Sequence, residues 1–290
     1  MKLTGRRESS NVDDRRSRGT ATKAGLGLGG MLLIAVMAYF TSGGDMGQVI
    51  NAVVENAATE TVTSGGEAYT PTKEEEELAT FAKQILAGTE DVWTDQFKKM
   101  GRTYHAPRLV LFHGSVSSGC GNASTSSGPF YCSADQSVYI DLEFFTTMRQ
   151  QFGTAGDFAY AYVIAHEVGH HVQNELGILS KVHQMMSRSS EKEANQWSVR
   201  LELQADFFAG CWAFHDNKMF NSLEAGDVEE GLAIAAKIGD DYLQKQAYGY
   251  TIPESFNHGT SAQRSRWLRK GISRGDLNEM DTYNIPYNDL

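Results

Sequence analysis

Residues 161–173 read AYVIAHEVGHHVQ and place two histidines, His166 and His170, four positions apart. Four residues of an α-helix amount to a net rotation of about 40°, so both imidazoles project from one face, one turn apart. That spacing allows both rings to bind a single Zn²⁺ ion. The surrounding residues are apolar and predict a buried helix over roughly 157–176, in which unpaired histidines would be costly. The stretch therefore predicts a metal-binding helix.

Glu167 directly follows the first histidine, and on a helix it points past a metal held by the pair. A carboxylate in that position can accept a proton from an attacking water and deliver it to a leaving amine. Gly169, in the same stretch, would allow a neighbouring backbone to approach closely. The H-E-x-x-H spacing therefore indicates a hydrolase with Glu167 as its catalytic base, although the motif by itself also occurs by chance.

A catalytic zinc takes three protein ligands and leaves one coordination position open. The extended metzincin signature needs glycine and histidine where this chain has Gln173 and Leu176, and the inverted H-x-x-E-H order is absent. The remaining candidate is Glu202 in the stretch RLELQAD, whose neighbours are apolar nearly all round, so that a carboxylate there needs a partner. We predict that Glu202 is the third ligand. Asp206, one turn later, is predicted to accept the free ring N–H of a liganding histidine.

His258 lies in ESFNHGTSAQRSRW, just before a predicted helix start at which Thr260 and Gln263 have capping-box spacing. It is either an ordinary loop histidine beside that cap or a catalytic residue that donates a hydrogen bond to the developing oxyanion. Arg264 is either structural or a residue that binds a substrate carboxylate.

The net charge of −10 is unevenly distributed along the chain. Residues 1–23 hold seven basic and three acidic side chains, a balance of +4, which leaves −14 for the remainder and argues against binding of nucleic acid. Residues 24–40 (AGLGLGGMLLIAVMAYF) form an uncharged run of 17, the lower limit for a membrane-spanning helix. A cleaved signal peptide and a buried core helix are the alternatives. The basic flank predicts a cytoplasmic N-terminus, a single-pass anchor in the inner membrane and a periplasmic C-terminal domain.

Cys120 and Cys132 bracket the polar loop GNASTSSGPFY, and we expect them to form a disulfide in an oxidising compartment. A zinc-binding role is the alternative, although the eleven residues between them do not match a zinc knuckle. Cys211 lies in a helical run and is expected to be a buried, inert thiol.

The expected organisation is a basic cytoplasmic segment over 1–23, a transmembrane anchor over 24–40, a flexible tether over 41–72 and one domain over 73–290. The predicted fold is α+β and mainly helical, with a small sheet before the key helices. Strands are expected in RLVLF after Pro107 and at Val138–Ile140, and the helical periodicity of apolar residues predicts helices from 73 to about 100 and over 143–152, 157–176, 191–216, 225–247 and 261–272.

Several stretches spread over nearly the whole chain resemble the neutral zinc metallopeptidase family of bacterial membrane-anchored proteins, the YpfJ-like group. They are GRRESSNVDDRR, TEDVWTDQF, GPFYCSADQSVYIDLEFF, YVIAHEVGHHVQ, SVRLELQADFFAGCWA and HGTSAQRSRWL. The resemblance implies a zincin-like domain whose gluzincin-like site maps onto His166, Glu167, His170 and Glu202, with Zn²⁺ as the cofactor. It also implies that the strand ending in Val138–Ile140 pairs with an extended peptide substrate.

The expected function is that of a membrane-anchored zinc metallopeptidase that hydrolyses extended polypeptides outside the cytoplasm. The alternative is a catalytically silent, zinc-binding membrane adaptor for extracytoplasmic protein partners. Glu167 favours the enzyme, because a purely structural metal site has no use for a base beside an open coordination position.

Overall fold

The computed structural model describes residues 1–18, 70–153 and 156–290. The anchor expected over 24–40 and the tether from residue 41 to 69 lie outside these ranges. Among the helices of the described ranges, none combines the length and the apolar character that a membrane crossing requires.

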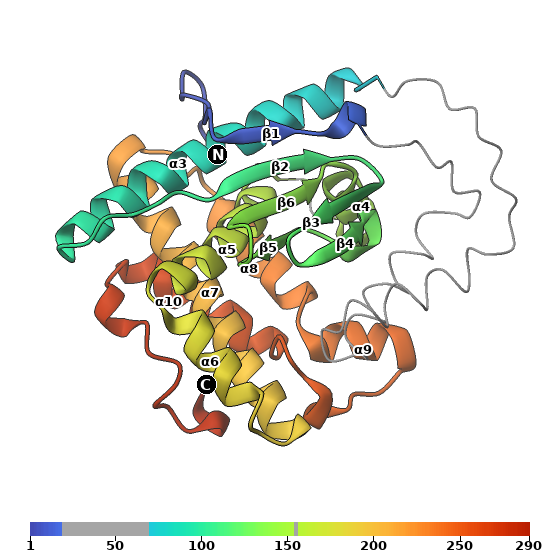
Figure 1. Cartoon of the computed structure of the whole chain (residues 1–290), viewed down its shortest axis with the longest axis vertical. Coiled ribbons are helices and arrows are strands. Elements are labelled where there is room, and N and C mark those ends of the chain that lie inside the picture. Colours follow the sequence, from blue (N-terminus) through green and yellow to red (C-terminus); the bar gives the residue numbers. More distant parts are fainter. Residues whose placement is uncertain (19–69, 154–155) are drawn as a thin grey trace, which may run out of the picture.

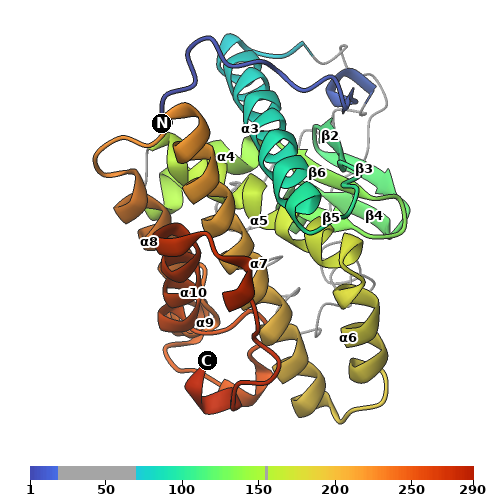
Figure 2. The ribbon, with the colours of Figure 1, turned by 90° about the vertical axis from the view of Figure 1, so that its left-hand side faces the viewer.

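Helices dominate the described part of the chain, as the predicted α+β class requires (Figure 1). The long helix α7 and its neighbours α5 and α10 form the centre of the helical part, and α3 runs across the sheet (Figure 2). The helices of the described residues are α3 (Lys73–Lys99), α4 (Glu143–Phe152), α5 (Asp157–Glu175), α6 (Ile178–Met186), α7 (Glu191–Phe220), α8 (Asp227–Lys237), α9 (Asp240–Tyr248) and α10 (Ser261–Arg274).

The main sheet has four short strands in the order β1-β2-β6-β5. Strands β1, β2 and β6 run parallel, and β5 pairs with β6 in the antiparallel direction. The strands are β1 (Val12–Asp14), β2 (Arg108–Phe112), β5 (Phe130–Cys132) and β6 (Ser137–Asp141), beside a separate hairpin of β3 (Ser115–Ser118) and β4 (Gly121–Ser124).

The expectation that Val138–Ile140 offer an edge for a substrate is wrong, because β6 lies inside the sheet. Leu109–Leu111 of β2 occupy one side of this stretch, and β5 occupies the other. All five residues of β6 are buried. The edge strand on this side of the sheet is β5, which no neighbouring strand covers on its outer side in the described residues.

Helix α3 begins where its sequence predicts. The Thr72 hydroxyl accepts a hydrogen bond from the Glu75 backbone N–H, and the Glu75 carboxylate accepts one from the Thr72 N–H, which together form a capping box. Its predicted apolar face is buried in the core, at Ile85, Leu86, Val92, Trp93 and Phe97. Burial of this face against the sheet and α5 stabilises the helix more than its intrinsic propensity does.

The single helix expected over 225–247 is divided into α8 and α9. The break falls at Gly239, where an added Cβ atom would lie 2.3 Å from the backbone nitrogen of Ser261. The first residue of α10 therefore packs directly on the connection between α8 and α9. Such long-range packing cannot be read from local periodicity.

Residues 1–18 belong to the folded body. Strand β1 pairs with β2, Arg6 forms two hydrogen bonds with the Asp216 carboxylate of α7 (2.7 and 3.2 Å), and Arg16 pairs with Asp14 and Glu76. This arrangement differs from the separate basic segment expected over 1–23. The N-terminal segment packs on the body because acidic groups, several of them on α3 and α7, pair with its basic side chains.

Candidate metal centre

Helix α5 presents His166 and His170 side by side, with ring centroids 4.8 Å apart. Helix α7 brings Glu202 to the same point, with one carboxylate oxygen 3.1 Å from His166 Nε2 and the other 3.4 Å from His170 Nε2. One potential ligand atom from each residue lies within 4.8 Å of the other two. The three ligands predicted from the sequence therefore converge, and their number and type suit a zinc ion with one open coordination position.

The close approach of the two helices depends on Gly169. A Cβ atom at this position would lie 2.9 Å from the carbonyl oxygen of Ala205 on α7. This contact confirms the role predicted for Gly169. It lets α7 approach closely enough for Glu202 to reach both histidines.

Asp206 orients the first histidine, as predicted. Its carboxylate lies 2.8 Å from His166 Nδ1 and is completely buried. An N–H at Nδ1 donates to this carboxylate and leaves the lone pair of Nε2 for a metal.

Two residues complete a buried network around this carboxylate. Tyr162 donates its hydroxyl proton to Asp206 (2.5 Å), and Arg264 binds both carboxylate oxygens (2.9 and 3.0 Å). The same arginine also contacts the Tyr162 hydroxyl and the Ile238 carbonyl. These contacts favour the structural alternative for Arg264. Tyr162 was missed in the sequence, although its position one turn before His166 on the same helix face was an available signal.

His170 has an equivalent partner that was also missed. Its Nδ1 lies 3.0 Å from the side-chain oxygen of Gln173, whose amide nitrogen donates to the Leu201 carbonyl (2.6 Å). The hydrogen bond to Leu201 keeps the side-chain oxygen of Gln173 directed at the His170 imidazole. Both histidines are therefore held with Nε2 facing Glu202.

The charges of the site are coupled. Burial by itself would raise the pKa of Glu202, but the electrostatic effects of His170 and His258 and the hydrogen bonds from His166 and His170 together outweigh it and hold this pKa well below its usual range. Burial by itself would lower the pKa of His166, but the Asp206 and Glu202 carboxylates outweigh it and raise this pKa to about 10. In the absence of metal, His166 therefore carries a proton at neutral pH, and metal binding has to displace it.

Glu167 lines the same cavity as the three candidate ligands. Burial raises its pKa above the usual range, and the neighbouring charges of His166 and His170 oppose part of that shift. A hydrogen bond from the Tyr131 backbone on β5 also reaches this carboxylate. A carboxylate whose pKa is raised in this way is suited to accept a proton and release it again.

The three candidate ligands and Glu167 lie in one cleft of about 720 Å³. Its walls come from β5, the hairpin and helices α4, α5, α6, α7, α9 and α10. They are largely apolar, and the lining residues include Phe130, Tyr131, Phe144, Met148, Leu179 and Leu201. The volume and character are those of a substrate-binding cavity.

The edge strand β5 is tied to α5 by His171, which is completely buried. One ring nitrogen of His171 lies 3.0 Å from the Tyr131 hydroxyl, and the other lies 2.6 Å from the His105 carbonyl. His171 therefore has a packing role between α5, β5 and the segment at His105. It also holds β5 beside Glu167.

His258 lines the same cleft, with 16 % of its side chain exposed. Its backbone N–H donates to the Asp240 carboxylate (2.8 Å), and its Nδ1 lies 3.5 Å from the other carboxylate oxygen. The predicted capping box of Thr260 and Gln263 is confirmed directly behind it. The structure therefore brings His258 to the cleft, where both of its predicted roles are compatible with its position.

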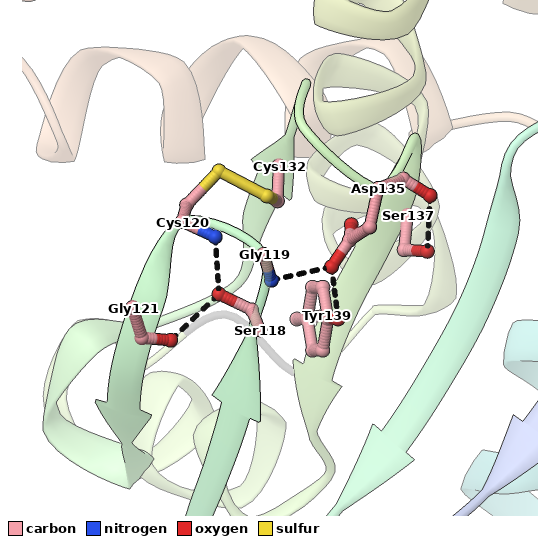
Figure 3. The surroundings of a disulfide bond; sticks show 8 residues. All are labelled: Ser118, Gly119, Cys120, Gly121, Cys132, Asp135, Ser137 and Tyr139. Carbon is pink, nitrogen blue, oxygen red and sulfur yellow. Dashed lines mark hydrogen bonds between the residues drawn. A yellow bond between two sulfur atoms is a disulfide. The ribbon is translucent and has the colours of Figure 1, made fainter.

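The predicted disulfide between Cys120 and Cys132 is present, and it joins the turn of the hairpin to the end of β5 (Figure 3). The carboxylate of Asp135 reinforces this connection by accepting hydrogen bonds from the Gly119 N–H and the Tyr139 hydroxyl. Cys211 is a free, buried thiol, as expected, and burial raises its pKa.

A second group of potential ligands, His113, Asp141 and Glu143, was not foreseen. The Asp141 carboxylate already accepts hydrogen bonds from the backbone N–H groups of Gly114 and Glu143 and from the Thr125 hydroxyl. These bonds explain Asp141 as a residue that organises the start of α4.

The described residues combine a mainly helical α+β fold with an H-E-x-x-H helix, a carboxylate from a following helix and a strand edge beside the cleft, and this set of potential ligands suits a zinc ion. The chain belongs to the family described as "Putative neutral zinc metallopeptidase", whose model matches residues 1–283. The resemblance stated from the motifs is thereby confirmed.

Two relatives illustrate how far the similarity extends. The chain is 45% identical to "Uncharacterized protein YpfJ" of Escherichia coli K12, over 98% of this chain and 99% of the relative. It is 43% identical to "Uncharacterized protein Mb2605" of Mycobacterium bovis, over 62% of this chain and 63% of the relative. No solved structure matches the chain.

Proposed function

We propose that this protein is a zinc-dependent peptidase that cleaves extended polypeptides. The observation that carries the proposal is the convergence of His166, His170 and Glu202 beside Glu167, in the lining of a largely apolar cleft. When bound there, a zinc ion would supply Lewis acidity toward the scissile carbonyl and toward the attacking water.

The residues of the chain would then perform the proton transfers. Glu167 accepts the proton of the attacking water and delivers it to the leaving amine. Asp206 and Gln173 keep the two imidazoles aligned through the hydrogen bonds at Nδ1. This division of roles explains why a base with a raised pKa lies beside a carboxylate whose pKa is held low.

The outer edge of β5 is the proposed position of the substrate backbone. An extended peptide can add to such an edge by main-chain hydrogen bonds. Phe130 and Tyr131 of β5 line the cleft together with Glu167, whereas Val138–Ile140 are enclosed by neighbouring strands. His258, which lines the same cleft, is proposed to donate a hydrogen bond to the oxyanion that forms during attack.

The decisive variant is Glu167→Gln. We expect it to retain bound zinc, because the three ligands are unchanged, and to lose cleavage of an unfolded protein such as casein by roughly 10²–10⁴-fold, the usual contribution of a general base. Glu175→Gln is the matched control, since Glu175 lies on the same helix and pairs with His105 outside the proposed machinery.

The outcomes separate the two candidate functions. A Glu167→Gln variant as active as wild type would contradict the proposed base. A wild-type protein that retains zinc and cleaves no unfolded substrate would favour the zinc-binding adaptor.

A further inference from the structure

We propose that residues 1–18 and the body formed by residues 70–290 lie on the same side of any membrane, because they fold as one unit. This inference does not depend on the proposed function. It replaces the single-pass topology expected from the sequence, in which residues 1–23 and the body would lie on opposite sides.

The first support is the main sheet itself. Val12, Asp13 and Asp14 pair in register with residues 109–111 of β2. The Leu109 N–H donates to the Asn11 carbonyl (3.0 Å), and the Arg15 N–H donates to the Leu111 carbonyl (2.7 Å). Without β1, this edge of β2 would expose unpaired backbone groups.

The second support is a buried ion pair between the segment and α7. Asp216 is completely buried, and Arg6 binds both of its carboxylate oxygens. Helix α3 has Gly88 at the crossing point, where an added Cβ atom would lie 2.8 Å from both Arg6 Nη2 and Asp216 Oδ1. Without Arg6, Asp216 would be left as a buried charge lacking this partner, which is strongly unfavourable.

The third support concerns the charges that predicted a cytoplasmic N-terminus. Arg7 pairs with Glu90 and Asp91 of α3. Together with the pairs of Arg6 with Asp216 and of Arg16 with Glu76, these contacts join three of the basic side chains that suggested retention in the cytoplasm to acidic groups of the body. The presence of these three arginines is accounted for by folding onto the body.

The fourth support is the position of the two chain ends that border residues 19–69. The Arg16 guanidinium lies 3.0 Å from the Glu76 carboxylate, so the end of the N-terminal segment lies beside the start of α3 (Figures 1 and 2). An odd number of membrane crossings between these points is incompatible with the pairing. The two described ends of the chain therefore lie on the same side of any membrane.

The direct test uses single cysteines at exposed positions of the full chain. Ser10→Cys reports on the N-terminal segment and Lys181→Cys on the body, whereas the native Cys211 is buried. A membrane-impermeant maleimide is applied to oriented membrane vesicles from cells that produce each variant. We expect both positions to be labelled in one vesicle orientation and protected in the other. Labelling in opposite orientations would overturn the proposal.

A second test measures the coupling of Arg6 and Asp216 in the full chain prepared from membranes. We expect Arg6→Ala to lower the melting temperature. The double variant with Asp216→Ala should have a melting temperature no lower than that of the less stable single variant. Arg188→Ala, at an exposed position, is the control and should leave the melting temperature unchanged. If Asp216→Ala fails to fold, Gly88→Ala serves instead, because it displaces the Arg6 side chain without removing a charge. No effect of Arg6→Ala would contradict the inference.

Discussion

The two walls of the cleft are built by different means. The helical wall, formed by α5, α7 and α10, is held by a buried polar network centred on Asp206. The sheet wall, formed by β5 and the β3–β4 hairpin, consists of short strands joined by a disulfide and by the contact of His171 with Tyr131. We infer that metal binding depends on the first wall and substrate binding on the second. Substitutions in the two walls should therefore change different quantities.

The largest expected effect is that of Glu202→Ala in the helical wall. Loss of one of three ligands should abolish zinc retention through dialysis and, with it, all cleavage. Zinc content is measured by atomic absorption. Glu193→Ala is a control on the same helix, since Glu193 forms only a capping box at the exposed start of α7. Full retention of zinc by Glu202→Ala would contradict the proposed coordination.

Arg264→Met should be the next most severe change. It leaves Asp206 buried without its strongest cationic partner, and breaking a buried pair in this way costs about 3–5 kcal/mol. Urea unfolding measures this loss. If the arginine also holds Asp206 in place for His166, zinc affinity should fall by about 10–100-fold. Arg266→Met, two positions along the same helix and partly exposed at its contact with the chain end, should cost far less.

Removal of the disulfide tests the sheet wall. Cys120→Ser with Cys132→Ser should destabilise the protein by about 2–4 kcal/mol. Because the bond fixes the end of β5, we expect KM for an extended peptide to rise more than kcat falls, with zinc affinity unchanged. A drop in zinc affinity equal to that of a helical-wall variant would remove the distinction between the walls.

Proton release should distinguish the walls as well. The pKa of His166 is raised to about 10 by the Asp206 and Glu202 carboxylates, so this ring is protonated at pH 7 in the metal-free protein, and Glu202 raises the pKa of His170 as well. Zinc binds neutral imidazoles, so binding should release protons, and zinc affinity should rise with pH up to about 10. Calorimetry in buffers of different ionisation enthalpy counts these protons. Asp206→Asn should release fewer, because it removes a carboxylate that raises the pKa of His166.

The helical wall was largely predictable from the sequence. His166 and His170 share a helix face by spacing alone, and Glu202 and Asp206 are conspicuous as carboxylates in an apolar run. Their convergence confirms that local patterns identified the candidate ligands. The role of Gln173 was missed. Its side chain is fixed by the Leu201 carbonyl on α7, a long-range contact that the sequence around His170 does not reveal.

The sheet wall and the N-terminal segment were predicted less well. The order of strands depends on pairing between distant parts of the chain, so β6 was taken for an edge although β2 and β5 enclose it. The three-residue strand β1 has too little periodicity to be recognised. Its partner β2 also lies far along the chain, since Val12 pairs with Leu109. Short strands specified by long-range contacts are the features that local patterns predict worst.

The smallest expected effect is that of Tyr131→Phe, which removes the hydroxyl that contacts His171 and leaves the backbone of β5 intact. Loss of one hydrogen bond should cost about 0.5–1.5 kcal/mol of stability. Zinc affinity should not change, because neither His166 nor His170 contacts this hydroxyl, whereas KM should rise slightly as β5 loosens beside Glu167. Phe130→Leu, on the same strand but without a bond to α5, controls for altered packing in the cleft. An effect of Tyr131→Phe on zinc affinity would show that the two walls are mechanically coupled through His171, the neighbour of a ligand.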